Sequence, residues 1–120
     1  MATFTKILLS GSTGGRPIKV AASGTPGTTI HTTQASSGVI DEVWLYATNT
    51  SASAVNLTIE LGGTTSPDDQ IIVGIPSKSG LTLILPGCVL TGDGSSGRTI
   101  RAFGGSSNNI NIVGYVNRIS

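Results

Sequence analysis

Apolar residues recur at every second position through most of this chain, and this alternation restricts its fold more than any other feature. In the run 55–61, four apolar side chains alternate with three polar ones. Successive side chains of a β-strand point to opposite faces, so the run predicts a strand with one buried and one polar face. The same alternation marks four further runs: Val43–Ala47, Ile71–Ile75, Leu81–Leu85 and Ile110–Asn117. Shorter candidate strands are Thr3–Leu9, Pro17–Ala22, Thr28–Thr33 and Ile100–Phe103.

Turn-forming segments such as TNTSAS, GGTTSPDD and TGDGSSG separate these runs. Strands that recur about every 8–12 residues with turns between them are typical of a β-sandwich or barrel. No window has the spacing of a substantial amphipathic helix, and we interpret Ser66–Asp69 as a turn rather than a short helix. We therefore predict one all-β domain, residues 1–120. It is a jelly-roll-like β-sandwich of about eight strands, with residues 1–25 as an extended N-terminal arm or as two ordinary strands.

The charge balance excludes several classes of partner. Seven Lys and Arg against six Asp and Glu give a net charge of +1, so no basic field is available for nucleic acid. Charged residues make up 11% of the chain, against about 25% in typical soluble domains, which favours self-association. No stretch approaches the ~20 apolar residues of a membrane span. The first residues hold too short an apolar run for a secretory signal, which predicts folding in a cytoplasm.

Residues capable of chemistry are few. A Ser-His-Asp relay would need the one histidine, His31, but no serine lies in a G-x-S-x-G motif. We interpret His31 as a strand residue that faces solvent or an interface, and the one cysteine, Cys88, as a small buried hydrophobe. Asp41 and Glu42 are adjacent on a strand and therefore point to opposite faces. The other acids lack calcium-loop spacing. We predict no catalytic residue, no metal ligand and no cofactor.

Aromatic side chains provide the remaining candidate site. Trp44 and Tyr46 share the strand face opposite to Val43 and Leu45. They could complete the core, anchor a subunit contact, or stack on sugar rings. Tyr115 and Asn117 on the last strand are further interface candidates.

Four segments carry a resemblance to a known family: DEVWLYATNTSASAVNLTIELGG, LTLILPGCVL, IRAF and NINIVGYVNRIS. They resemble small virion structural proteins of tailed bacteriophages, above all capsid decoration (cement) proteins, over roughly Val39–Ser120. The resemblance implies a short β-sandwich, often a homotrimer, on the outside of the capsid where neighbouring major capsid proteins meet. No sequence mark separates a decoration protein from a neck or tail component. A carbohydrate-binding module that uses Trp44 and Tyr46 is the alternative from another class.

We therefore expect a non-enzymatic protein, made in the host cytoplasm and located on the capsid exterior. Its expected partners are the major capsid protein and further copies of itself, with no nucleic acid and no membrane. The segment Met1–Thr29 holds three of the seven basic residues, Lys6, Arg16 and Lys19. As an extended arm it could lie on a neighbouring protein and add a strand to it.

Overall fold

The protein is described by a computed structural model that covers residues 2–120. These residues form nine antiparallel strands and no helix, which confirms the predicted all-β fold. The Ser66–Asp69 segment is a turn, as predicted. The strands are β1 (Phe4–Leu8), β2 (Ile18–Val20), β3 (Thr28–Thr32), β4 (Ile40–Asn49), β5 (Val55–Leu61), β6 (Gln70–Ile75), β7 (Thr82–Thr91), β8 (Thr99–Gly104) and β9 (Ile110–Ile119).

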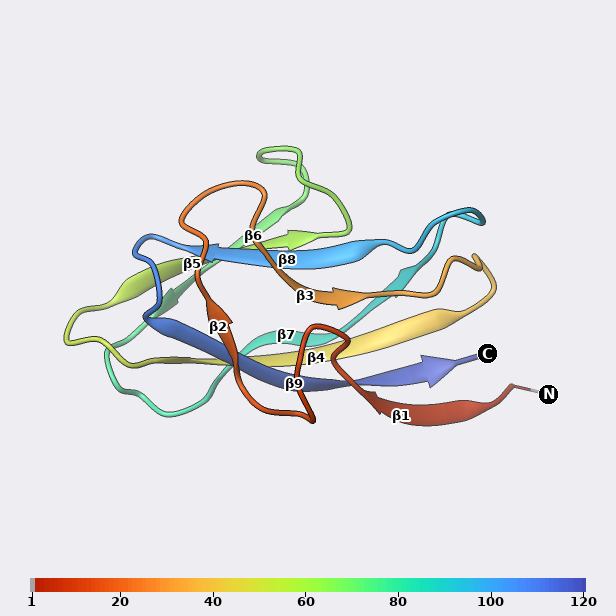
Figure 1. The fold of residues 1–120 in the computed structure, drawn as a ribbon, viewed down its shortest axis with the longest axis horizontal. Coiled ribbons are helices and arrows are strands. Elements are labelled where there is room, and N and C mark those ends of the chain that lie inside the picture. Colours follow the sequence, from red (N-terminus) through yellow and green to blue (C-terminus); the bar gives the residue numbers. More distant parts are fainter. Residues whose placement is uncertain (1) are drawn as a thin grey trace.

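The strands lie in two sheets that pack face to face (Figure 1). Sheet A has the order β1-β9-β4-β7, with β2 also paired to β9, and sheet B has the order β3-β8-β5-β6. The chain reverses direction between β5 and β6, which pair with each other. Moving away from this hairpin in both directions along the chain, β4 pairs with β7, β3 with β8, and both β1 and β2 with β9. A long hairpin rolled up in this way is a jelly roll. There are nine strands rather than eight because β1 and β2 are one edge strand interrupted by residues 9–17.

The core lies between the sheets and consists of the alternate side chains that the sequence pattern predicts. Val43, Leu45 and Ala47 of β4 are fully buried, as are Leu57 and Ile59 of β5. Complete burial of one Val, Leu or Ile side chain is worth about 1.5–3 kcal/mol. Further core side chains come from the other strands, among them Val20, Ile30, Ile75, Leu85, Ile100, Ile110, Ile112 and Val116.

The alternation predicted for Leu81–Leu85 is wrong. Leu85 is buried, but Leu83 is 46% exposed and Leu81 is 60% exposed and precedes β7. Opposite residues of paired strands share a face, and the register places Leu85 against Leu45 but Leu83 against Tyr46. This shift is a β-bulge, which moves Leu83 to the outer face and leaves Ile84 and Leu85 both buried.

Residues 2–25 have the structure of two ordinary strands rather than of a separate arm. β1 pairs with β9 over residues Phe4–Leu8, and β2 pairs with β9 over Ile18–Val20. The connecting segment is also attached, since Leu9 is 2% exposed and the Gly11 N–H donates to the Ile30 carbonyl at 2.9 Å. Met1, the first residue of the predicted arm, lies outside the described residues.

The outer face of β5 is solvated at Asn56 but not at Thr58 and Glu60, although the sequence predicts a polar outer face along the whole strand. Glu60 is fully buried and Thr58 is 7% exposed, although both point away from the core. The β2–β3 loop, residues 21–27, lies over this part of sheet B (Figure 1). Glu60 accepts hydrogen bonds from the Gly27 N–H at 2.7 Å and from the Thr25 hydroxyl. A carboxylate and two donors therefore attach the loop to the sheet.

Candidate functional site

The outer face of sheet A carries the aromatic residues that the sequence singles out. Antiparallel pairing places Trp44 of β4 directly opposite Tyr115 of β9, with both side chains outward. Their rings are stacked, with centroids 6.4 Å apart and planes 13° apart. Tyr46 lies two residues further along the same face of β4. We name Trp44, Tyr46 and Tyr115 the aromatic face; its members are half-buried and lie outside the core.

Polar contacts hold the two stacked rings in place. The Trp44 Nε1–H donates to Glu42 Oε1 at 2.8 Å, and Asn117 Nδ2 donates to the same oxygen at 3.0 Å. These two hydrogen bonds, with the one from Trp44 the stronger, hold the pKa of the Glu42 carboxyl below its ordinary value. On the other side, Lys6 Nζ lies 4.8 Å from the centre of the Tyr115 ring, a cation–π contact. Rings fixed in this way lose little further freedom when a partner binds.

Gly87 of β7 gives Trp44 the room it needs. A Cβ atom at this position would lie 2.8 Å from Trp44 Cζ2, closer than carbon atoms approach. The backbone there also has φ +69°, in the left-handed region that favours glycine. The indole therefore lies directly on the backbone of the neighbouring edge strand.

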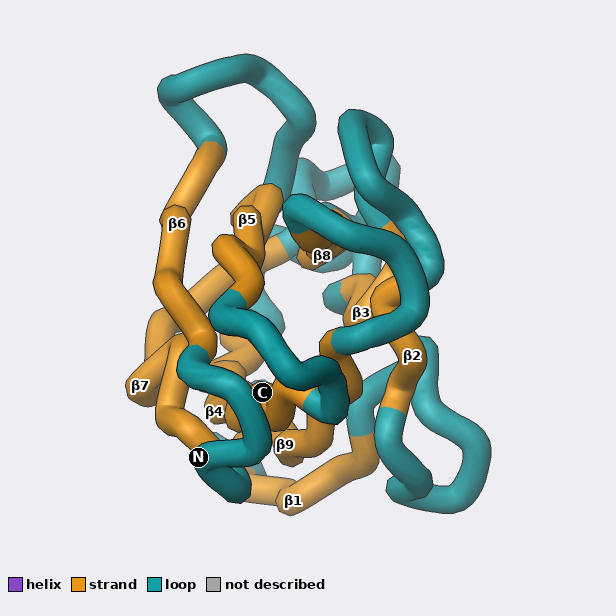
Figure 2. Tube along the Cα trace, turned by 90° about the vertical axis from the view of Figure 1, so that its left-hand side faces the viewer, coloured by secondary structure: helices purple, strands orange, loops and turns teal. Residues whose placement is uncertain are grey.

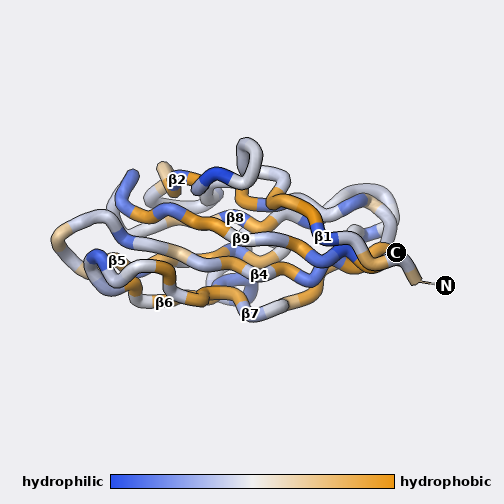
Figure 3. Tube along the Cα trace, turned by 90° about the horizontal axis from the view of Figure 1, so that it is seen from below, coloured by the Kyte–Doolittle hydropathy of each residue, from blue (hydrophilic) through white to orange (hydrophobic). Residues whose placement is uncertain are grey.

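Exposed apolar side chains surround the aromatic face. The register places Phe4 and Leu8 of β1, and Leu83 and Val89 of β7, on the same outer face as Trp44. They are 73%, 55%, 46% and 60% exposed respectively. In Figure 3 the strands of sheet A run alongside each other, with hydrophobic segments on the two outer strands β1 and β7. These side chains make the outer face of sheet A a candidate binding surface.

The three predicted basic residues lie along one edge of this face. Lys6 is on the outer side of β1, and Lys19 is exposed on β2, where it pairs with Asn111. Arg16 is exposed in the segment between these strands. The structure therefore places the aromatic residues and Asn117 centrally on sheet A, Lys6 and Lys19 on its β1–β2 edge, and Arg16 in the segment that connects these two strands.

The interpretation of His31 as a solvent- or interface-facing residue is wrong, because the side chain is 1% exposed. A register shift between Thr29 and His31 breaks the alternation of β3, so Ile30 and His31 are both buried. His31 Nε2 donates to Asp41 Oδ2 at 2.7 Å, and Nδ1 accepts from the Ser10 N–H at 3.0 Å. We assign this neutral tautomer from the hydrogen bonds. Both ring nitrogens are occupied, so His31 is not placed to act as a general base.

Asp41 is the centre of this buried network, and sequence spacing had no signal for it. Arg118 of β9 binds the carboxylate with two hydrogen bonds, Nε to Oδ1 at 2.7 Å and Nη2 to Oδ2 at 2.8 Å. Burial acts to raise the pKa of Asp41, but the hydrogen bonds from Arg118 and His31 outweigh it and leave that pKa lowered. Because His31 is on sheet B and Asp41 on sheet A, the network ties the sheets together.

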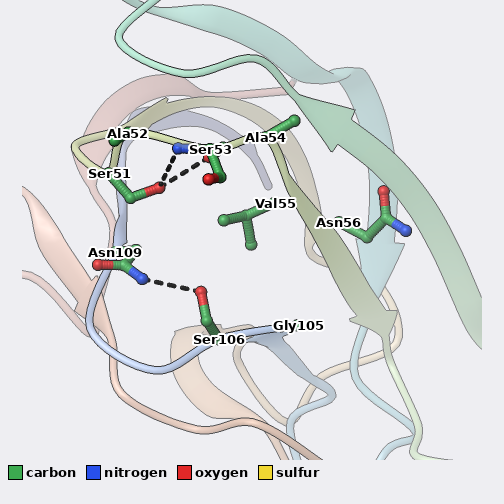
Figure 4. A pocket seen from close by; sticks show the side chains of 9 residues that line it. All are labelled: Ser51, Ala52, Ser53, Ala54, Val55, Asn56, Gly105, Ser106 and Asn109. Atoms are coloured by element: carbon green, nitrogen blue, oxygen red, sulfur yellow. Dashed lines mark hydrogen bonds between the residues drawn. The ribbon is translucent and has the colours of Figure 1, made fainter.

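A shallow hollow of about 460 Å³ lies at one end of the sandwich (Figure 4). The β4–β5 and β8–β9 loops form it around Val55, with Ser51 and Asn109 among the polar groups. Ser51 Oγ donates to the Ser53 carbonyl at 2.8 Å, and Asn109 Nδ2 donates to Ser106 Oγ at 2.8 Å. No aromatic ring lines the hollow.

Neither a metal centre nor a membrane-spanning helix is found in the part of the chain that the structure describes. Residues 2–120 contain no group of three His, Cys, Asp or Glu side chains that could hold a metal ion. None of their elements is a helix long and apolar enough to cross a membrane. Cys88 is free and half-buried against the core.

No known protein family, curated protein or solved structure matches this chain.

Proposed function

We propose that this chain is a non-enzymatic structural protein of a phage virion that binds the outer surface of the capsid and stabilises the head. The observation that carries the proposal is the aromatic face with its apolar surroundings. The resemblance to decoration proteins supplies the partner. Jelly rolls occur in both viral capsid and lectin domains, so the fold alone does not discriminate between these functions.

The composition of the outer face of sheet A supports a protein partner over a sugar. Trp and Tyr are enriched in protein interfaces, where they act as hot spots. A sugar site would need free polar groups beside the rings to bind hydroxyls. Here Glu42 Oε1 already accepts hydrogen bonds from both Trp44 and Asn117. This oxygen thus serves to fix the indole, which suits a preformed protein contact.

The two parts of sheet A have different roles in this proposal. The aromatic face makes the contact between copies of the chain, in a homotrimer as the resemblance implies. Lys6, Arg16 and Lys19 at the β1–β2 edge contact acidic groups of the major capsid protein. Closed threefold symmetry repeats this edge three times, so weak contacts add up to tight attachment.

Co-sedimentation of the purified protein with empty phage capsids tests the proposal. We expect the wild type to sediment with the capsids and the variant Lys19→Gln, which removes one exposed positive charge from the β1–β2 edge, to lose much of this binding. The matched control is Arg101→Gln, which removes one positive charge from sheet B, and it should bind like the wild type. Binding by the wild type should weaken as salt rises, because contacts between charges at the rim of an interface are screened.

Three outcomes would contradict the proposal. Binding to a glycan array without binding to capsids would indicate a carbohydrate-binding module. Density confined to the portal vertex of the particle in cryo-electron microscopy would indicate a neck or tail component. A protein that remains monomeric at micromolar concentration in analytical ultracentrifugation would exclude the homotrimer.

A further inference from the structure

The four edge strands of the sandwich differ in how they are protected. Open edges expose unpaired N–H and C=O groups, and proteins usually protect them with charges, proline, bulges or a covering segment. Residues 10–11 cover the β3 edge through two hydrogen bonds. The Gly11 N–H donates to the Ile30 carbonyl, and the Thr32 N–H donates to Ser10 Oγ. β7 contains Pro86 and two register shifts. β1 has Lys6 at its centre.

β6 has none of these protections. Its sequence, QIIVGI, contains no charge and no proline, and its pairing with β5 runs without a register shift. Ile72 points to the outer face of sheet B and is 63% exposed. Figure 2 shows β6 at the side of the molecule opposite to β2 and β3, so this edge is separate from the basic β1–β2 edge.

Along β6, residues whose backbone N–H and C=O groups bond to β5 alternate with residues whose backbone groups point away from β5. The Leu61 N–H donates to the Asp69 carbonyl, and the register continues from this pair with Ile71 opposite Ile59 and Val73 opposite Leu57. Hydrogen-bonded pairs alternate with non-bonded pairs in an antiparallel ladder. Residues 69, 71, 73 and 75 therefore bond toward β5, whereas Ile72 and Gly74 direct their N–H and C=O groups to the open side.

We propose that β6 is a self-association edge, on which β6 of a second copy pairs antiparallel about a twofold axis at Ile72. In this register Ile72 lies opposite Ile72 of the second copy, and Gly74 opposite its Gln70. The two Ile72 residues then exchange both backbone hydrogen bonds. Ile71 and Val73 continue the core side of a sheet that runs through both copies. The contact is isologous, because the same surface serves on both sides.

Charges at the ends of β6 favour a second copy in this orientation as the occupant. Asp68, exposed in the turn before β6, and Lys78, exposed in the segment after it, carry opposite charges. Antiparallel pairing brings the acidic start of one strand toward the basic end of the other. Parallel pairing would place Asp68 against Asp68. The uncharged strand between them produces no repulsion.

This contact goes beyond the proposed function, because it neither uses sheet A nor requires a capsid. A homotrimer assembled through the aromatic face would keep its β6 edges free. The β6 contact would then join protomers of neighbouring trimers into a network over the particle surface. The isolated protein is therefore sufficient for the test, and its failure is distinguishable from failure to bind capsids.

Sedimentation velocity of the isolated protein and of Ile72→Lys is the first test. Two lysines opposed at the twofold axis repel each other. We therefore expect the sedimenting species of the variant to have at most half the mass of the wild-type species. Because Ile72 is exposed, the variant should keep the fold, and its far-ultraviolet circular dichroism spectrum should match that of the wild type. The matched control is Asn56→Lys, which adds the same charge to an exposed position on sheet B one strand from the edge, and it should associate like the wild type. Equal masses for wild type and Ile72→Lys would overturn the proposal. They would mean that β6 does not pair with a second copy, even if it accepts a strand of a different protein.

Disulfide cross-linking tests the register. In a Cys88→Ser background, Ile72→Cys should form a disulfide-linked dimer on mild oxidation, since opposed hydrogen-bonded residues have Cα atoms about 5.5 Å apart, within disulfide range. Gly74→Cys should not cross-link, because it faces Gln70 of the second copy. A Cβ at residue 74 has room, its nearest neighbour being Asn56 Oδ1 at 3.6 Å. If Gly74→Cys cross-links as readily as Ile72→Cys, or if neither variant cross-links, the proposed pairing is overturned.

Discussion

Replacing Asp41 by Asn removes the charge from the buried network while keeping the shape of the side chain. Asp41 is fully buried and accepts two hydrogen bonds from Arg118 and one from His31, all of 2.7–2.8 Å. An amide oxygen can replace part of this acceptor capacity, but it cannot neutralise the guanidinium. The variant therefore leaves Arg118 as an uncompensated positive charge.

The expected loss of stability is about 3 kcal/mol. Removing one partner of a buried ion pair costs about 3–5 kcal/mol. The Arg118 side chain remains 19% exposed and keeps some hydration, which places the loss at the low end of this range. For a domain of this length, each kcal/mol corresponds to roughly 4 °C in the midpoint of thermal unfolding, so the midpoint should fall by about 12 °C.

Urea unfolding of wild type and Asp41→Asn at several pH values measures this loss. Because the pKa of Asp41 is lowered in the folded protein, its stabilising effect is complete above the ordinary value of 3.8 and is lost as the pH falls below it. The stability difference should therefore be constant at higher pH and shrink below 3.8. Asp68→Asn, which changes an exposed carboxylate, is the control and should change little. A difference of less than about 1 kcal/mol, or one that does not shrink in acid, would refute the role given to this network.

Three further predictions concern the core and the aromatic face. Leu57→Ala empties a fully buried position between the sheets and should lower the free energy of unfolding in urea by about 2–5 kcal/mol. Trp44 is the chain's one tryptophan, and its fluorescence should change with pH around a midpoint below pH 4.5, because the pKa of its partner Glu42 is lowered. This change should be absent in Glu42→Gln. Gly87→Ala should cost about 2 kcal/mol, from the left-handed backbone and the close approach to the indole, and should change the near-ultraviolet circular dichroism of Trp44. An unchanged spectrum would contradict the contact.

The strands of the core could be predicted from the sequence because their alternation follows from local geometry. Val43, Leu45 and Ala47 are buried as their spacing predicts, and Trp44 and Tyr46 lie on the opposite face. This reasoning fails at a β-bulge, because the extra residue moves the side chains beyond it to the opposite face of the sheet. The exposure of Leu83 and the burial of His31 both follow from register shifts that no local pattern reveals.

Contacts between distant segments account for what sequence reasoning missed at the site. The stacking of Trp44 on Tyr115 depends on the β4–β9 register, and the link from Asp41 to Arg118 joins residues 77 positions apart. Glu60 has the spacing of a solvated strand residue and is buried only because the 21–27 loop crosses over it. The aromatic candidates could be named from composition, but their arrangement could not.

The central position of β9 in sheet A has a consequence for the order of folding. β9 pairs with β1, β2 and β4, so three of the other four strands of the sheet depend on the last strand of the chain. Phe4 and its partner Ile119 are 115 positions apart (119 − 4), and closing so long a loop is slow because of its entropy. During synthesis, β1 and β2 therefore leave the ribosome long before their partner exists. Sheet B has all of its strands by residue 104, so it can form first and act as the template on which the other layer closes.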